Sequence, residues 1–222
     1  MINKNIKAIL FDLDGTLVDS APQITESLGH ALVKAHRPPL EQTTVISMIG
    51  DGVPTLTARA FAATGGRDPD GETRAIAEFH DHYQKIAHTS MAYPQSIETL
   101  TALQAAGHRL GLCTNKSMVG TELVLKNLGI ADLFMTVIAG DSLPIRKPHP
   151  QPLLETIRRL GFTAPQAIYI GDGPVDVATA KAAHVCMIAV SYGYPRMPPT
   201  DLGADHLINH MADLPPLLAT LK

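Results

Sequence analysis

Short apolar segments alternate with stretches of helical periodicity over most of the chain. Each apolar segment has the length of a buried strand and ends at a polar cluster. The predicted strands cover 8–11, 109–113, 133–139, 167–170 and 185–190, and the predicted helices between them cover 96–106, 118–128, 150–160 and 175–183. This alternation predicts a mainly parallel sheet with helices on both of its faces.

The stretch 21–92 departs from the alternation because it holds helical patterns and no convincing strand. Helices are predicted over 23–34, 43–49, 53–63 and 73–87, with glycine and proline pairs between them. We therefore predict an α/β protein with two domains. Residues 1–20 and 93–222 form a Rossmann-like core around the parallel sheet, and residues 21–92 form an inserted, all-helical cap.

The polar clusters that end the predicted strands are expected at one edge of the sheet, where α/β proteins bind their ligands. The first strand ends on Asp12 and Asp14. Alternate residues of an extended segment point the same way, so these two carboxylates can share one side. Neighbouring carboxylates are electrostatically costly unless a cation or a proton lies between them. This cost indicates a functional site, with ordinary turn residues as the alternative.

Composition argues against several classes of function. The 222 residues carry a formal net charge of −3, which favours neither nucleic acid nor an anionic membrane surface as a partner. No apolar run reaches the roughly 20 residues that span a bilayer, and the first residues show no signal-peptide core. Cys113 and Cys186 lie in apolar segments and are expected to be thiols of a cytoplasmic protein, with a disulfide as the alternative.

Four motifs follow one another along the chain, each at the end of a predicted strand or the start of a predicted helix. They are Asp12-x-Asp14-Gly15-Thr16, Thr114-Asn115, Lys147-Pro148 and Gly171-Asp172-x-x-x-Asp176. Their order and spacing resemble the phosphatase branch of the haloacid dehalogenase superfamily over nearly the whole chain. The helical insertion lies where that family has its C1-type cap.

Further segments resemble the phosphoglycolate phosphatases within this branch. They are 49–53, Tyr93-Pro94, Thr114-Asn115-Lys116, 147–150 and 191–194. Three residues depart from the pattern. Gly173 stands where the family commonly has serine or threonine, and Gln95 and His184 stand where it usually has glycine. At His184 this predicts a non-glycine residue where a helix ends and a positive φ is expected.

The resemblance implies a phosphomonoester hydrolase that uses Mg²⁺. Asp12 would be the nucleophile and would form an aspartyl-phosphate. Asp14 would protonate the leaving alcohol and then take a proton from the attacking water. Mg²⁺ would be bound by Asp12, the backbone carbonyl of Asp14 and Asp172. Asp176 would orient a metal-bound water rather than bind the ion directly.

The resemblance also implies the groups that hold the phosphate. Thr114, Asn115 and Lys147 would bind its oxygens, and Lys147 would also neutralise charge in the transition state. Each residue has an ordinary alternative. Thr114-Asn115 could cap a helix, and a lone lysine such as Lys147 is most often a solvated loop residue.

Substrate choice is expected to lie in the cap. The loop Gly50-Asp51-Gly52 resembles the family's segment that reaches into the core site. A substrate carboxylate needs a cationic partner, for which Arg59 is the first candidate and Lys34 and Arg37 are others. All three could equally be exposed helix charges.

The expected partner is a small phosphorylated metabolite, and 2-phosphoglycolate is the first choice of substrate. The alternatives are a sugar phosphate, a nucleotide or pyrophosphate, or a phosphomutase reaction through the same aspartyl-phosphate. A non-catalytic phosphate-binding module is the alternative from another class. The sequence is compatible with a monomer and with a homodimer.

Overall fold

Six parallel strands form one sheet in the order β5-β4-β1-β6-β7-β8. The structure is a computed structural model that describes residues 6–194 and 196–221. The strands are β1 (Ala8–Phe11), β4 (Arg109–Cys113), β5 (Phe134–Ile138), β6 (Ala167–Gly171), β7 (Cys186–Val190) and β8 (His206–Ile208). The five predicted strands are therefore confirmed within one or two residues, and β1 lies in the middle of the sheet, between β4 and β6.

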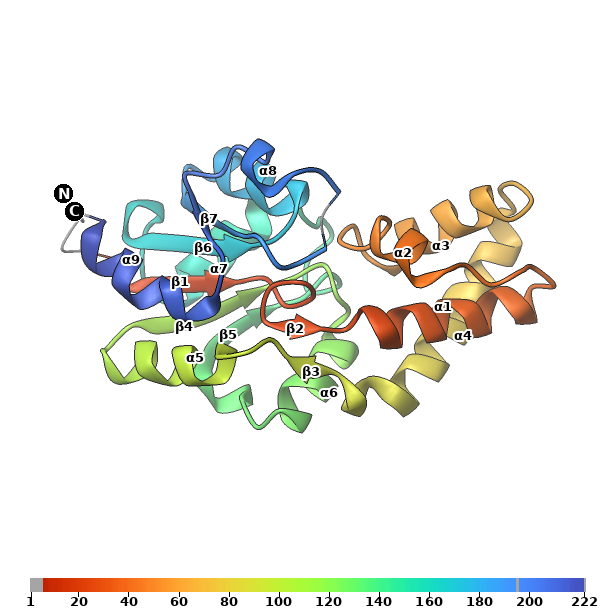
Figure 1. Ribbon diagram of the computed structural model, residues 1–222, viewed down its shortest axis with the longest axis horizontal. Helices are drawn as coiled ribbons and strands as arrows, with labels where there is room; N and C mark the ends of the chain where they lie inside the picture. The colour runs from red at the N-terminus through yellow and green to blue at the C-terminus, as the bar shows by residue number, and fades with distance from the viewer. Residues whose placement is uncertain (1–5, 195, 222) are drawn as a thin grey trace.

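Helices cover both faces of the sheet (Figure 1). They are α5 (Ser96–Ala105), α6 (Met118–Asn127), α7 (Gln151–Arg159), α8 (Pro174–Ala182) and α9 (Leu214–Thr220), with short 3₁₀ turns at Ala87–Thr89, Ala131–Leu133, Ala164–Gln166, Pro199–Asp201 and Met211–Asp213. Successive side chains of β1 point to opposite faces of the sheet and contact the two helix layers in turn. Ile9 and Phe11 belong to the apolar cluster that includes α5, α6 and α9, whereas Ala8 and Leu10 belong to the cluster with α7 and α8.

The end of the chain adds elements that the sequence pattern did not predict. Strand β8 pairs with β7, and α9 packs near α5. Strand β8 has three residues and only Ile208 is buried, so it shows neither an apolar run nor a clear alternation. Cys113 and Cys186 are free thiols on β4 and β7, as predicted.

Four helices fill most of the segment from residue 20 to residue 90, between the first two elements of the sheet domain and α5. They are α1 (Ala21–Lys34), α2 (Gln42–Ile46), α3 (Val53–Ala63) and α4 (Pro69–Ile86). Figure 1 shows them grouped beyond the carboxyl ends of the strands, beside the sheet rather than on it. Helix α1 packs mainly against α4. The four helices therefore cover the edge of the sheet formed by the carboxyl ends of the strands, where the sequence motifs lie.

A two-stranded ribbon corrects the prediction that 21–92 contains no strand. Strand β2 (Val18–Asp19) pairs antiparallel with β3 (Met91–Ala92), where Val18 lies opposite Ala92. Strands of two residues are too short to show an apolar–polar alternation, so they cannot be predicted from the sequence pattern. Just after β3, Gln95 has a φ of 64°, and His184 has a φ of 55° after α8. The expected left-handed conformation at His184 is therefore present.

Candidate active site

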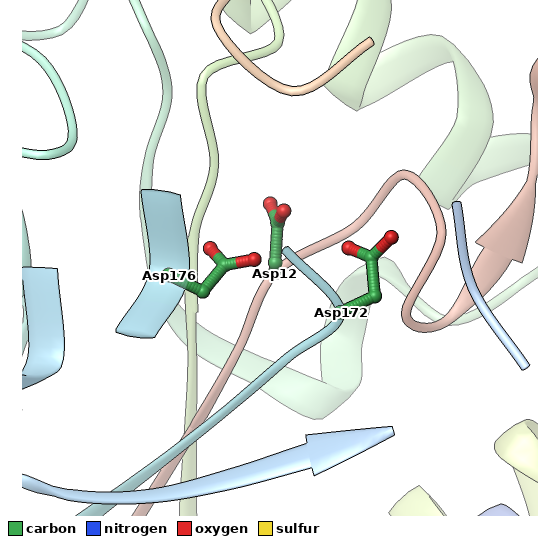
Figure 2. Close-up of side chains that lie close together, drawn as sticks. All are labelled: Asp12, Asp172 and Asp176. Carbon is green, nitrogen blue, oxygen red and sulfur yellow. The ribbon is translucent and has the colours of Figure 1, made fainter. Parts of the chain in front are cut away.

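Three buried carboxylates meet at the carboxyl ends of the central strands. Asp12 follows β1, Asp172 follows β6, and Asp176 lies in the first turn of α8. One oxygen from each lies within 4.8 Å of the others. Figure 2 shows Asp12 between the other two side chains. The parallel pairing of β1 with β6 therefore brings together residues that are far apart in the sequence.

Lys147 is the cation of this cluster. Its Nζ atom lies 2.7 Å from Asp176 Oδ1 and 3.1 Å from Asp12 Oδ1. Nζ also donates a hydrogen bond of 2.7 Å to the Tyr169 hydroxyl, which lies 2.8 Å from the Cys113 carbonyl. Burial lowers the pKa of Lys147, but attraction by Asp12 and Asp176 outweighs it and raises the pKa. Lys147 is therefore a fixed positive charge rather than a solvated loop residue.

The cluster holds more negative charge than Lys147 compensates. Burial raises the pKa of Asp12 to about 6, with Lys147 opposing this shift and Asp176 adding to it. Burial likewise raises the pKa of Asp172 well above its usual range, and Asp176 and Asp12 add to it. None of the residues that the structure describes donates a well-aligned hydrogen bond to Asp12 Oδ1, although this oxygen is buried. Oxygen ligands with uncompensated charge fit a divalent cation such as Mg²⁺.

Gly15 allows the first motif to approach Asp172. Its φ is +82°, and a Cβ atom there would collide with the Asp172 carboxylate. The backbone N–H of Tyr194 donates a hydrogen bond of 2.7 Å to Asp172 Oδ2 and holds this side chain in place. A side chain at position 15 would therefore displace a carboxylate of the cluster.

We expect Gly15→Ala to destabilise the protein more than a matched substitution at Gly107. Gly107 has a φ of +89°, and no atom that the structure describes lies within 4 Å of an added Cβ. Gly107→Ala therefore reports backbone strain alone, about 1 kcal/mol. Gly15→Ala adds the collision and is expected to cost about 2 kcal/mol more. Urea unfolding measures both, and equal losses would contradict the close approach to Asp172.

The Asp14 side chain contacts two groups outside the carboxylate cluster. Ser20 Oγ donates a hydrogen bond of 2.5 Å to Asp14 Oδ1. Lys116 Nζ lies 2.9 Å and 3.1 Å from the two carboxylate oxygens. Burial lowers the pKa of Lys116, but attraction by Asp14 outweighs it and raises the pKa. Lys116 belongs to the motif Thr114-Asn115-Lys116, and its contact with Asp14 was not predicted.

Asn115 connects the core to the cap and differs from its predicted role. Its Nδ2 atom donates to the carbonyls of Gly50, at 3.0 Å, and Lys147, at 3.1 Å, and its Oδ1 atom accepts from the Lys147 N–H. Both amide hydrogens are therefore used, and the side chain has none left for a phosphate oxygen. Thr114 is buried and lines the cavity next to Asp12.

A cavity of about 50 Å³ lies between the core motifs and helices α1, α3 and α4. Asp12, Asp14, Thr114, Asn115 and Lys116 line it from the core. The cap contributes apolar and polar residues that sequence reasoning did not single out, together with two predicted glycines: Ile24, Ile49, Gly50, Gly52, Val53, Leu56, Phe79, His80 and Tyr83. The loop around Gly50 and Gly52 therefore forms part of the cavity wall.

The side chains of Asp51 and Arg59 serve the cap loop itself. Arg59 Nη1 lies 2.5 Å from Asp51 Oδ2 and donates to the Met48 carbonyl at 3.0 Å. Arg196, from the core, lies 2.8 Å from the same Asp51 oxygen. Among the residues that the structure describes, Arg59 does not line the cavity. The expectation that Arg59 faces the substrate is therefore corrected, because its guanidinium binds Asp51 and the Met48 carbonyl and so stabilises the loop around Gly50.

The two other candidate cations of the cap also lie elsewhere. Arg37 donates a hydrogen bond of 2.9 Å to the Phe61 carbonyl, and its guanidinium lies 4.0 Å from the centre of the Phe61 ring. Lys34 lines a separate cavity between α1 and α4. Neither residue lines the site cavity in the described part of the chain. A cationic partner for a substrate must therefore come from another element.

Comparison with known proteins assigns the chain to a family. Residues 9–190 match the model of the haloacid dehalogenase-like hydrolases, and the chain belongs to this family. It is 45% identical over 215 residues to the phosphoglycolate phosphatase of Rhodospirillum rubrum, covering 94% of this chain and 89% of that protein. The phosphoglycolate phosphatase of Cereibacter sphaeroides is 40% identical over 217 residues, covering 96% and 98%. The chain is accordingly an enzyme, a phosphoric monoester hydrolase.

A solved structure supports the same assignment. The crystal structure of a predicted phosphoglycolate phosphatase from Haemophilus somnus 129PT superposes with a TM-score of 0.92 at 31% identity, covering 97% of this chain and 99% of the other. The family and the fold class that the motifs predicted are therefore confirmed. None of the helices in the described residues is long and apolar enough to cross a membrane.

Proposed function

We propose that this enzyme hydrolyses 2-phosphoglycolate to glycolate and phosphate with Mg²⁺ as its cofactor. The observation that carries the proposal is the buried group of Asp12, Asp172 and Asp176 around Lys147. Asp12 of this group lines a small cavity under the cap. Relatives named phosphoglycolate phosphatase, at up to 45% identity, support the choice of substrate. A cavity of about 50 Å³ favours a small ester over a nucleotide.

Asp12 is the proposed nucleophile. Its Oδ1 atom is buried and accepts no well-aligned hydrogen bond from the described residues, so a lone pair is available for attack on phosphorus. The new bond joins Asp12 to phosphorus while the bond between phosphorus and the glycolate oxygen breaks. Lys147, 3.1 Å from the same oxygen, offsets negative charge as the transition state forms. Bound to Asp12, Asp172 and the Asp14 carbonyl, Mg²⁺ would supply the charge that lets two anions approach each other.

Asp14 is the proposed proton carrier. It gives a proton to the departing glycolate oxygen and takes one from the water that hydrolyses the aspartyl-phosphate. Its contacts with Ser20 and Lys116 hold the carboxyl group in one place beside the cavity. Thr114 and backbone amides after Asp12 are proposed to bind phosphate oxygens. Asp176, which is hydrogen-bonded to Lys147 and the Gly173 N–H, positions Lys147 and the water around the cation.

We also propose that 21–92 moves as a cap relative to a core of 1–20 and 93–222. The chain passes between the two parts twice, once after β2 and once at β3. These two strands pair with each other, so the two parts are joined at one place. Contacts that link the two parts directly include the hydrogen bond from Asn115 to the Gly50 carbonyl and the ion pair of Arg196 with Asp51. Closure would exclude water while the phosphoryl group is transferred.

The substrate proposal predicts the order of kcat/KM values in a panel of small phosphate esters. We expect 2-phosphoglycolate to exceed a hexose phosphate, a nucleoside monophosphate and pyrophosphate by at least about tenfold, because the cavity is small and partly cationic. Phosphate release at saturating Mg²⁺ measures each value. A higher value for any of the competitors would replace 2-phosphoglycolate with that compound, and net isomerisation of a sugar phosphate would indicate a mutase.

A further inference from the structure

Recognition of a substrate carboxylate requires a cation that lines the cavity. Among the described residues, Lys116 and His80 are the basic side chains in the lining. Burial lowers the pKa of His80, so its imidazole is neutral at neutral pH. Arg196 lines the adjoining cavity over Asp172 and Asp176, but its guanidinium is paired with Asp51. Lys116 remains as the charged group of the cavity under the cap, since the cap cations lie elsewhere and Lys147 is held by the carboxylate cluster.

The position of Lys116 is fixed by the core and by the cap together. It follows β4, and its side chain is 7% exposed. Its Nζ atom lies 2.9 Å from Asp14 Oδ1 and 4.4 Å from the centre of the Tyr83 ring, which belongs to α4. A buried ammonium is costly unless it is paired. The protein therefore maintains a positive charge at the boundary between the cap and the proton carrier.

The structure assigns Lys116 as the residue that selects the substrate by binding its carboxylate, an inference that rests on the proposed function. In 2-phosphoglycolate the carboxyl carbon is two bonds from the oxygen that Asp14 protonates. A cation in hydrogen-bond contact with Asp14 is therefore next to the place where this carboxylate must lie. An ammonium has three donors, so Lys116 can keep Asp14 and still bind the substrate.

Tyr83 contributes from the cap side. Its ring face holds the Lys116 ammonium, which limits the positions that the ammonium can take. Within the described part of the chain, the Tyr83 hydroxyl is buried and has no hydrogen-bond partner. Such a group is costly to leave unpaired, and it lies on a side chain that lines the cavity. Lys116 and Tyr83 together therefore form a polar site that a small anionic leaving group would complete.

The test compares two esters of similar size in Lys116→Met and wild type. Ethyl phosphate is close in size to 2-phosphoglycolate and lacks the carboxylate. We expect the ratio of kcat/KM for 2-phosphoglycolate over ethyl phosphate to fall by about 10- to 100-fold in Lys116→Met, the value of a hydrogen bond to a charged group. Lys116→Arg, which keeps the charge, is expected to retain a larger share of the ratio.

The ratio separates this inference from two other outcomes. If Lys116 only positions Asp14, turnover of both esters falls together and the ratio stays constant, which would overturn the inference while the proposed function stands. If wild type itself does not prefer the carboxylate, the ratio is near one and both the substrate proposal and the inference fail.

Binding provides the same comparison when turnover is too slow to measure. In an Asp12→Asn background, calorimetry gives Kd for both esters with Lys116 present and with Lys116→Met. The inference expects the Kd of 2-phosphoglycolate to rise by about 10- to 100-fold and that of ethyl phosphate to change by less than about threefold. Equal changes in the two Kd values would overturn it.

Discussion

Asp12→Asn is expected to lower kcat for an aryl phosphate by at least about 10⁴-fold. The amide has nearly the same shape as the carboxylate, but it is a poor nucleophile and cannot form the aspartyl-phosphate. The thermal midpoint is expected to stay the same or rise, because burial already disfavours the charged form of Asp12, as its raised pKa indicates. Single-turnover kinetics and a thermal melt of the same sample measure both effects.

The control for this variant is Asp132→Asn. Asp132 is an exposed aspartate in the 3₁₀ turn that precedes β5, and so lies at the opposite end of this strand from the carboxyl ends where the site is. It is expected to retain wild-type kcat and a wild-type melting temperature. Near-normal turnover by Asp12→Asn would refute the nucleophile assignment, and equal losses in both variants would point to a general effect of the substitution.

Removal of Mg²⁺ is expected to abolish turnover and to lower stability at the same time. Without the cation, Asp12, Asp172 and Asp176 remain close together with Lys147 as their main counterion. Chelation by EDTA is expected to stop phosphate release, and added Mg²⁺ to restore it. At a Mg²⁺ concentration of 100 times Kd, linkage predicts about 2.7 kcal/mol of stabilisation, a rise of roughly 5 °C or more in melting temperature.

Asp172→Asn tests whether these carboxylates hold the ion. It is expected to raise the Mg²⁺ concentration needed for half-maximal activity by 10-fold or more and to reduce the shift in melting temperature. Asp201→Asn, an exposed aspartate in a 3₁₀ turn, is the matched control. Full activity in EDTA, or an unchanged Mg²⁺ response in Asp172→Asn, would rule out the proposed metal site.

The core of the fold could be predicted because its signals are local. The strand that ends in Phe11 is fully buried, and the polar residue that follows it marks its boundary. The same reasoning placed β4 and β6 within one residue of their observed ends. It failed for β8, whose three residues are mostly not buried, and for β2 and β3, which are too short to show a period.

In the candidate site, too, residues in local motifs could be predicted and contacts between distant elements could not. Asp12, Asp172 and Asp176 lie in short motifs at strand and helix ends, so topology alone brings them together. The contact of Lys116 with Tyr83 depends on how the cap meets the core, which no local pattern encodes. Arg59 was misplaced for a related reason. Its position on α3 was correct, but the direction in which that helix face points relative to the core is a tertiary property.

The ribbon of β2 and β3 also bears on how this enzyme can be re-engineered. Because Val18 lies opposite Ala92, the proposed cap is joined to the rest of the chain through two strands that lie one strand spacing apart, about 5 Å. Any folded segment whose termini are equally close could in principle be exchanged at this point without changing the register of the six-stranded sheet. The chemistry of Asp12 could then be combined with new substrate preferences by grafting one continuous piece of sequence.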